Sequence, residues 1–191
     1  HLRRETPFEA PAAGATAQTG PNTLGKIKAA KAINVAYSAD SLPFSFVGPN
    51  NEPAGYSIDL CKRAIAQIGR AVGEPNLKVN WLGGSVTERL QMVASGRADL
   101  ECANTTQTQS RLANVDFSNL IFIDAGGFLV KAGAPINQLA DLGGKRVAVL
   151  KGTTTETRLN DALRRRLVNA TVVAIADANE GVAMVASGSV D

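Results

Sequence analysis

Apolar residues in the first half of the chain switch between a spacing typical of strands and one typical of helices. A short helical stretch at residues 24–32 precedes an apolar run at 33–37, and residues 77–82 form a second run of strand length. Between the runs, Ser57 is a plausible N-cap for a helix whose apolar residues step by three or four: Ile58, Cys61, Ile65, Ile68 and Val72. Ser85 and Glu88 then form a capping box for a helix that ends at Gly96, and residues 100–103 follow as a short strand. This alternation predicts an α/β fold with a largely parallel sheet.

The same alternation restarts after an extended stretch at residues 121–131. A helical turn is predicted at 139–142, a buried strand at 146–150, and a loop at 151–155 that opens a helix carrying Leu159, Leu163 and Leu167. Residues 171–175 have the pattern of a further strand, and residues 177–180 have the composition of a second capping box. The second half therefore predicts another α/β unit.

An internal repeat relates the two halves. Residues 92–99, MVASGRAD, return as MVASGSVD at 184–191, with six of eight residues identical and an offset of 92. The predicted caps keep that offset, which favours two similarly built lobes, at residues 24–125 and 126–191, over two unrelated capped helices. The first copy continues into a strand and a polar loop, whereas the second stops at Asp191. We therefore expect an incomplete second lobe, with an unpaired strand edge through which copies could associate or with weakened ligand binding.

Composition and charge exclude several classes of protein. The formal net charge is only +3 and the basic residues form no long stripe, so nucleic acid is not an expected partner. No apolar window is long enough to span a membrane. The single histidine, His1, excludes a His-ligated zinc site and a histidine-dependent triad, and we predict neither a metal nor a cofactor. Residues 1–23 mix Pro, Ala, Gly and Thr without a period, and we interpret them as a disordered linker, a tag, or a mature terminus left after signal-peptide removal.

Two anion-binding features are expected to face each other across the cleft between the lobes. Thr106 follows a strand end, and Arg111 lies five residues beyond it; an arginine guanidinium binds carboxylates in a bidentate manner. In the second lobe, the loop at 152–155 opens a helix, whose N-terminal N–H groups also bind anions. Together they suit one small carboxylate. The alternatives are that Thr154 or Thr155 is only an N-cap and that Arg111 is a solvated surface residue.

Residues 24–191 resemble family 3 of the bacterial extracellular solute-binding proteins, and in particular the glutamate/aspartate-binding branch of amino-acid transport. The matching stretches occur in order along the chain, at residues 42–46, 55–61, 100–106 with Arg111, 116–118 and 141–145, followed by a strand and the sequence GTT. The resemblance implies the two-lobed type II periplasmic-binding-protein fold, with the second lobe truncated here.

The resemblance also implies a role for each candidate ligand-binding residue. Arg111 and the Thr106 hydroxyl would hold the α-carboxylate of an amino acid, joined by backbone N–H groups near Thr106 and Thr154. Thr153 is a further candidate beside Thr154, and Asn104 would offer its carbonyl to the α-ammonium. Arg89 matches an arginine that faces the side-chain carboxylate, and Phe44 would pack against the ligand. Ser38 stands where the branch tends to have an arginine, Val86 where it has a polar residue and Ala178 where it often has a histidine.

The two cysteines, Cys61 and Cys102, allow either two buried thiols or one disulfide. A secreted binding protein permits their pairing, and within this resemblance we favour the disulfide.

The expected function is that of a periplasmic binding protein, secreted with its signal peptide removed, which captures a polar or acidic amino acid and delivers it to an ABC-transporter permease. One alternative is a cyclohexadienyl-dehydratase-like enzyme on the same scaffold, for which Glu101 or Asp40 would have to act as the general acid or base. Another is an extracellular sensor module, or a truncated copy that no longer binds ligand. We predict that the chain is not an enzyme.

Overall fold

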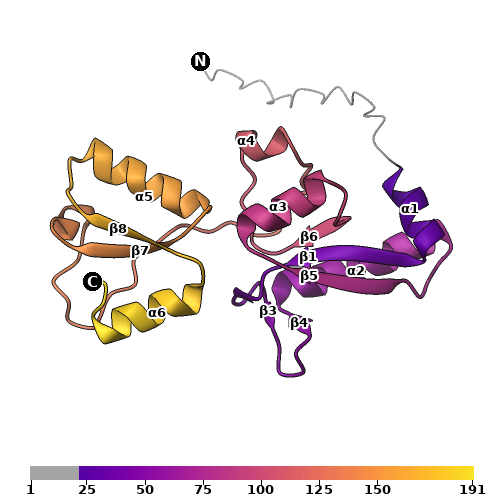
Figure 1. Ribbon diagram of the computed structural model, residues 1–191, viewed down its shortest axis with the longest axis horizontal. Coiled ribbons are helices and arrows are strands. Elements are labelled where there is room, and N and C mark those ends of the chain that lie inside the picture. Colours follow the sequence, from indigo (N-terminus) through magenta and orange to yellow (C-terminus); the bar gives the residue numbers. More distant parts are fainter. Residues whose placement is uncertain (1–21) are drawn as a thin grey trace, which may run out of the picture.

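The structure is a computed structural model in which residues 22–191 are described. Two lobes lie at opposite ends of the molecule and are joined by an extended segment (Figure 1). The expected interpretation of residues 1–23 as a linker falls almost wholly outside the described residues. Helix α1 (Thr23–Ala30) begins at the start of the described range, because the side chain of Asn22 accepts a hydrogen bond from the Gly25 N–H at 2.9 Å and caps it.

A three-stranded parallel sheet forms the centre of the first lobe. In spatial order its strands are β5 (Lys78–Gly83), β1 (Ala32–Tyr37) and β6 (Leu100–Cys102). The predicted parallel sheet is therefore present. Because all three strands run the same way, their carboxyl ends meet at one edge, where the loops carry the candidate site residues.

Helices cover both faces of this sheet. On one face, α1 and α2 (Tyr56–Val72) pack on alternate residues of β1, in a buried cluster that contains Ile27, Ile33, Val35, Ile58 and Ile65. On the other face, Ala36 of β1 packs with Met92 of α3 (Val86–Ala94). Burial of each of these isoleucines stabilises the fold by about 1.5–3 kcal/mol relative to leaving the side chain exposed. This packing holds the strands in place against the helices, and with them the loops at the strand ends.

Helix α2 starts differently from the expectation. Ser57 does not cap it: the helix begins at Tyr56, the N-cap is Gly55, and Ser57 lies inside the first turn with only 1% of its surface exposed. The first N–H groups donate instead to backbone carbonyls, from Tyr56 to Pro43 at 3.0 Å and from Ser57 to Phe44 at 2.9 Å. These carbonyls come from a small antiparallel sheet of β2 (Asp40–Ser41), β3 (Ser45–Val47) and β4 (Pro53–Ala54), at the turn between β2 and β3.

The second lobe has its own sheet and core. Strands β7 (Arg146–Leu150) and β8 (Thr171–Ile175) pair in parallel, and the short 3-10 helix η1 (Leu139–Leu142) and helix α5 (Thr154–Arg165) pack against them. Helix α6 (Ala178–Ser187) follows β8. The core contains Leu142, Val149, Leu159 and Leu163.

Two details of the second lobe correct the expectations. Leu167 does not belong to the apolar face of α5, because the helix ends at Arg165 and Leu167 is 92% exposed, while Val168 takes its place against the core. The predicted capping box at α6 is only half formed: the Asp177 carboxylate accepts from the N–H groups of Asn179 and Glu180.

The repeat has the same structural role in both lobes. Asp99 Oδ2 accepts from the Asn34 N–H at 2.8 Å, and the Asp99 N–H donates to the Asn34 carbonyl at 2.8 Å. Asp191 makes the same two bonds with Arg146 at the start of β7, both at 2.9 Å. The final aspartate of each copy thus ties the end of a helix to the first strand of its sheet.

Candidate functional site

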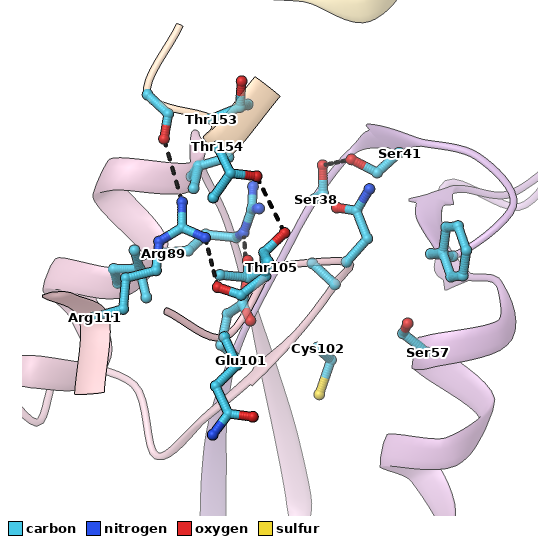
Figure 2. A pocket seen from close by; sticks show the side chains of 18 of the residues that line it. Ser38, Ser41, Ser57, Arg89, Glu101, Cys102, Thr105, Arg111, Thr153 and Thr154 are labelled. Carbon is cyan, nitrogen blue, oxygen red and sulfur yellow. Dashed lines mark hydrogen bonds and ion pairs between the residues drawn. The ribbon is translucent and has the colours of Figure 1, made fainter. Parts of the chain in front are cut away.

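A cleft between the lobes brings together residues that are distant in the sequence. Loops at the carboxyl ends of β1, β5 and β6 line it from the first lobe, and residues between Leu150 and Arg158 line it from the second. Figure 2 shows Arg111, Thr105, Thr153 and Thr154 close to one another on one side of this pocket. The cleft predicted from the alternation of strands and helices is present.

A disulfide fixes the first-lobe floor of the cleft. Cys61 of α2 is bonded to Cys102, the last residue of β6, as predicted. Asn104, Thr105 and Thr106 follow closely, so the bond holds the start of their loop against the helix. Asn104 is exposed and lines the cleft.

Arg111 bridges the two lobes. It lies on the short helix α4 (Gln109–Leu112), where the Thr108 hydroxyl accepts from its N–H at 3.3 Å. Its Nη1 donates to the Thr106 carbonyl at 2.7 Å, and its Nη2 donates to the Gly152 carbonyl of the second lobe at 3.4 Å. The charge on Arg111 is therefore held at the cleft by neutral carbonyls, without a carboxylate partner among the described residues.

The pKa of Arg111 reflects this position. Burial lowers it, the nearby Glu101 carboxylate raises it, and the Arg89 guanidinium lowers it. An arginine nevertheless stays protonated at neutral pH. Arg111 thus offers a fixed positive charge to an anion in the cleft.

The start of helix α5 faces Arg111 from the second lobe. Thr153 is the N-cap: its hydroxyl accepts from the Glu156 N–H at 3.1 Å and donates to the Leu150 carbonyl at 2.7 Å. The expected N-caps, Thr154 and Thr155, are therefore wrong, because the cap lies one residue before Thr154. The Thr154 hydroxyl is instead 3.3 Å from that of Thr106, across the cleft. The first backbone N–H groups of α5 have the dipole orientation that favours anions.

Arg89 forms a buried ion pair close to Arg111 and Thr154 (Figure 2). Its side chain is 2% exposed, its Nε lies 2.9 Å from Glu101 Oε1, and its Nη1 donates to the Gly84 carbonyl at 2.6 Å. Glu101 Oε1 also accepts from the Thr105 hydroxyl at 2.6 Å. The Arg89 Nη2 is buried and has no hydrogen-bond partner among the described residues.

Phe44 and Ser38 lie at the other side of the cleft. Phe44 packs edge-on against Phe122 of the connecting segment and Tyr56 of α2, with ring centroids 4.9 and 6.1 Å apart. Ser38 is 2% exposed, and its hydroxyl donates to Asp40 Oδ1 at 2.9 Å.

Several residues that the sequence suggests for the site line the cleft, but the contacts between them are not evident from the sequence. Hydrogen bonds bring Arg111, Thr106 and Thr154 together. Figure 2 shows Thr153 and Arg89 near this group and Ser38 apart from it. Phe44 packs against Phe122 and Tyr56. Glu101 and Asp40 have no evident partners in the sequence, yet Glu101 pairs with Arg89, and Asp40 Oδ2 accepts from the Ala178 N–H of the second lobe at 3.0 Å. Neither contact can be predicted from the short residue spacings that bring side chains together within one helix, because the partners lie 12 and 138 residues apart in the sequence.

Neither a metal cluster nor a membrane-spanning helix is present in the described part of the chain. Within residues 22–191, no group of three or more His, Cys, Asp and Glu side chains is arranged to hold a metal ion. In the same range, every helix is too short or too polar to cross a bilayer.

The sequence and the fold match known proteins. Residues 33–180 match the family model described as bacterial extracellular solute-binding proteins, family 3. The L-glutamate/L-aspartate-binding protein of Pseudomonas aeruginosa is 33% identical over 167 residues, which are 87% of this chain and 55% of that protein. The glutamate/aspartate import solute-binding protein of Escherichia coli is 30% identical over 179 residues, or 94% of this chain and 57% of that protein. The chain thus spans somewhat more than half the length of these relatives.

Solved structures give the same result. The crystal structure of an ancestral amino acid-binding protein, a precursor of cyclohexadienyl dehydratase, matches with a TM-score of 0.74 and 28% identity, over 88% of this chain and 72% of that one. A periplasmic binding protein from Brucella ovis with glutathione bound matches with a TM-score of 0.76 and 28% identity, over 90% of this chain and 54% of that one. The predicted two-lobed fold is confirmed, and the chain belongs to family 3 of the bacterial extracellular solute-binding proteins.

Proposed function

We propose that this chain captures an amino acid in the cleft between its lobes and delivers it to the membrane permease of an ABC transporter. The names of the Pseudomonas and Escherichia relatives support an amino-acid ligand and an import role. One observation carries the proposal: the Arg111 guanidinium lies at the cleft with carbonyl partners only, opposite the start of α5. A positive charge and a helix N-terminus that face each other are suited to one carboxylate.

The proposed ligand contacts follow from these positions. Arg111, the Thr106 hydroxyl and the first N–H groups of α5 at Thr154 receive the α-carboxylate. Thr153 positions that helix start, since both functions of its hydroxyl are already used within the lobe. The exposed Asn104 offers its side-chain carbonyl to the α-ammonium.

The remaining candidates act on the ligand side chain. Phe44 provides an apolar wall, and its edge-on packing against Phe122 holds its ring in place. Arg89 faces the ligand side chain from below. Ser38, which bonds to Asp40, lies on the other side of the cleft from Arg89.

The proposed location is the periplasm, reached by secretion and removal of a signal peptide. The family description and the periplasmic proteins among the relatives support this location. The disulfide is consistent with it, because such bonds persist in oxidising compartments.

Binding without turnover is favoured over catalysis. The relatives at about 30% identity are described as binding proteins, although one structural neighbour is a precursor of a dehydratase. A general acid or base must be free to exchange a proton with the substrate. Both candidates for that role are engaged: Glu101 with Arg89 and Thr105, and Asp40 with Ser38 and Ala178.

Calorimetric titration with the twenty amino acids tests the proposal. We expect saturable binding of at least one amino acid and its recovery unchanged after release. The Arg111→Ala variant should lose about 2 to 5 kcal/mol of binding free energy, because a desolvated charge pair is broken. Arg165→Ala is the matched control, since it removes an exposed cation from the far end of α5.

Two results would contradict the proposal. If none of the twenty amino acids binds, the ligand is not an amino acid of this set and the proposed function is wrong. If the wild type and the Arg111→Ala variant bind the ligand with equal affinity, Arg111 does not bind its carboxylate, whichever amino acid is bound.

A further inference from the structure

Three hydrogen-bonded contacts join the lobes across the cleft in the described part of the chain. In two of them, the hydroxyls of Thr106 and Thr154 lie 3.3 Å apart, and Arg111 donates to the Gly152 carbonyl at 3.4 Å. Both of these contacts use side chains that the proposed function assigns to the α-carboxylate of the ligand. A bound ligand therefore replaces them.

The third contact joins Asp40 of β2 to the start of α6. Asp40 Oδ2 accepts from the Ala178 N–H at 3.0 Å, and neither residue belongs to the proposed ligand contacts. Figure 2 shows Ser38 and Ser41, which flank Asp40 closely in the sequence, on the side of the pocket away from Arg111. This third contact can therefore persist while a ligand is bound.

A network of serine hydroxyls fixes the Asp40 carboxylate. The Ser38 hydroxyl donates to Asp40 Oδ1 at 2.9 Å and lies 2.8 Å from the Ser41 hydroxyl. The Ser45 hydroxyl accepts from the Ser38 N–H at 3.0 Å and donates to the Ser38 carbonyl at 2.8 Å. Ser38 and Ser45 are 2% and 0% exposed, so they are held firmly in the first lobe. Both oxygens of Asp40 are thus engaged, one within its own lobe and one across the cleft.

Carboxylates cap the start of α6 from both lobes. Asp177, within the second lobe, accepts from the N–H groups of Asn179 and Glu180 at 2.6 and 3.2 Å. The Ala178 N–H has its partner in the first lobe instead. Asp40 forms no ion pair among the described residues, so this N–H and the positive end of the helix dipole are its electrostatic partner across the cleft. That attraction is lost when the lobes separate.

We propose that Asp40 is a positioning residue, which holds the second lobe closed through the start of α6 and thereby slows the release of ligand. The effect on release rests on the proposed function, whereas the effect on the lobes does not. A bond that exists only in the closed form shifts the equilibrium between open and closed forms toward the closed one. Because a ligand enters and leaves through the open form, the bond acts mainly on the dissociation rate.

Amide hydrogen exchange, followed residue by residue by NMR, tests the bond without a ligand. In Asp40→Ala we expect the Ala178 N–H to exchange about threefold or more faster than in the wild type, in line with the loss of a charge at a helix start. The N–H groups of Asn179 and Glu180 should keep their rates, because Asp177 caps them. Equal exchange at Ala178 in both proteins would overturn the inference. Faster exchange at all three positions would also overturn it, because Asp40 would then support the folding of α6 rather than its position.

A second variant removes the donor of the bond instead of the acceptor. Ala178 is the first residue of α6, where proline is well tolerated because the N–H there has no partner within the helix. Ala178→Pro therefore deletes the bond to Asp40 and keeps the helix start. Circular dichroism confirms that the variants are folded.

Stopped-flow measurement of L-glutamate release compares the two single variants with the double variant. Each single variant should release L-glutamate about threefold or more faster than the wild type, with a smaller change in the association rate. The double variant should be no faster than the faster single variant, because both substitutions break the same bond. Single effects that multiply in the double variant would overturn the inference, since the two residues would then act independently. If L-glutamate does not bind, exchange at Ala178 alone decides.

Asp124→Ala is the matched control. Asp124 also lines the cleft, but among the described residues it accepts only from the adjacent Ala125 N–H, so its variant should release L-glutamate at the wild-type rate. The outcomes separate the inference from the proposed function. If no amino acid binds and exchange at Ala178 still responds to Asp40→Ala, the proposed function fails and the contact between the lobes stands. If an amino acid binds and exchange does not respond, the role of Asp40 is wrong.

Discussion

A single glycine, Gly55, controls the backbone next to the cleft residue Phe44. Its φ is +120°, and a Cβ added there would lie 2.5 Å from the Phe44 carbonyl oxygen. That carbonyl is the acceptor for the second N–H of α2, so the close approach is part of how the helix begins. Glycine is needed here because a side chain meets backbone atoms that cannot move independently.

We predict that Gly55→Ala destabilises the protein by about 1–3 kcal/mol or more, the usual cost of a strained backbone position. The same change also shifts Phe44, which lies in the cleft. Gly127→Ala is the matched control, since a Cβ at Gly127 meets nothing within 4 Å. Urea unfolding of both variants measures the difference; equal stabilities would contradict the close contact at Gly55.

Residue-level expectations succeed where the chemistry is local. The Ser85–Glu88 capping box forms as predicted because both partners are three residues apart, and the spacing alone determines the contact. The expectation for Ser57 is wrong because its competitors, the loop carbonyls of Pro43 and Phe44, are supplied by tertiary structure. The Arg89–Glu101 pair escapes sequence reasoning for the same reason, although each residue is a candidate on its own.

At the scale of elements, the N-terminal capping box of α3 shows how two residues close in the sequence stabilise a helix. In α3 the Glu88 carboxylate accepts from the Ser85 N–H at 2.8 Å, and the Ser85 hydroxyl accepts from the Glu88 N–H at 3.4 Å. The pKa of Glu88 is lowered, chiefly by the bond from the Ser85 backbone, then by the Ser85 side chain. A carboxylate with a lowered folded-state pKa stabilises the fold above its unfolded pKa, about 4.3, and that contribution is lost as the pH falls through the folded pKa.

We predict that Ser85→Ala lowers the free energy of unfolding by about 1 kcal/mol, the usual cost of losing an N-cap. Glu88→Gln keeps an oxygen acceptor for the Ser85 N–H but removes the charge, so its deficit relative to wild type should be present at pH 7 and shrink below about pH 4. Denaturant unfolding at several pH values measures both effects. A deficit in Glu88→Gln that stays constant down to about pH 3 would contradict the assigned role of the charge.

Strand boundaries follow the sequence pattern closely in the two parallel sheets, whereas the small antiparallel sheet of β2, β3 and β4 was not predicted. Strands β7 and β8 coincide with the predicted runs at 146–150 and 171–175, because short apolar runs between turn residues leave few alternatives. The expectation for Leu167 fails because apolar spacing continues past the end of α5, and a periodic pattern does not show where a helix stops. The sequence predicts the extended segment at 121–131, but the packing of its Phe122 on Phe44 depends on the fold.

At the scale of the molecule, the lobes meet through three sets of contacts around the cleft. Asp40 Oδ2 accepts from the Ala178 N–H at the start of α6, Thr106 meets Thr154, and Arg111 donates to Gly152. Two of these contacts place a polar group of the first lobe at a helix N-terminus of the second.

The central claim is that the positive charge of Arg111 and the start of α5 bind the α-carboxylate of an amino acid. The most direct measurement is calorimetric titration of the wild-type chain with its best amino acid and with the same compound carrying an α-carboxamide in place of the α-carboxylate. The predicted result is a loss of binding of about 2–5 kcal/mol for the α-amide in the wild type, and a much smaller difference in Arg111→Ala. Equal affinities for the two compounds in the wild type would contradict the claim.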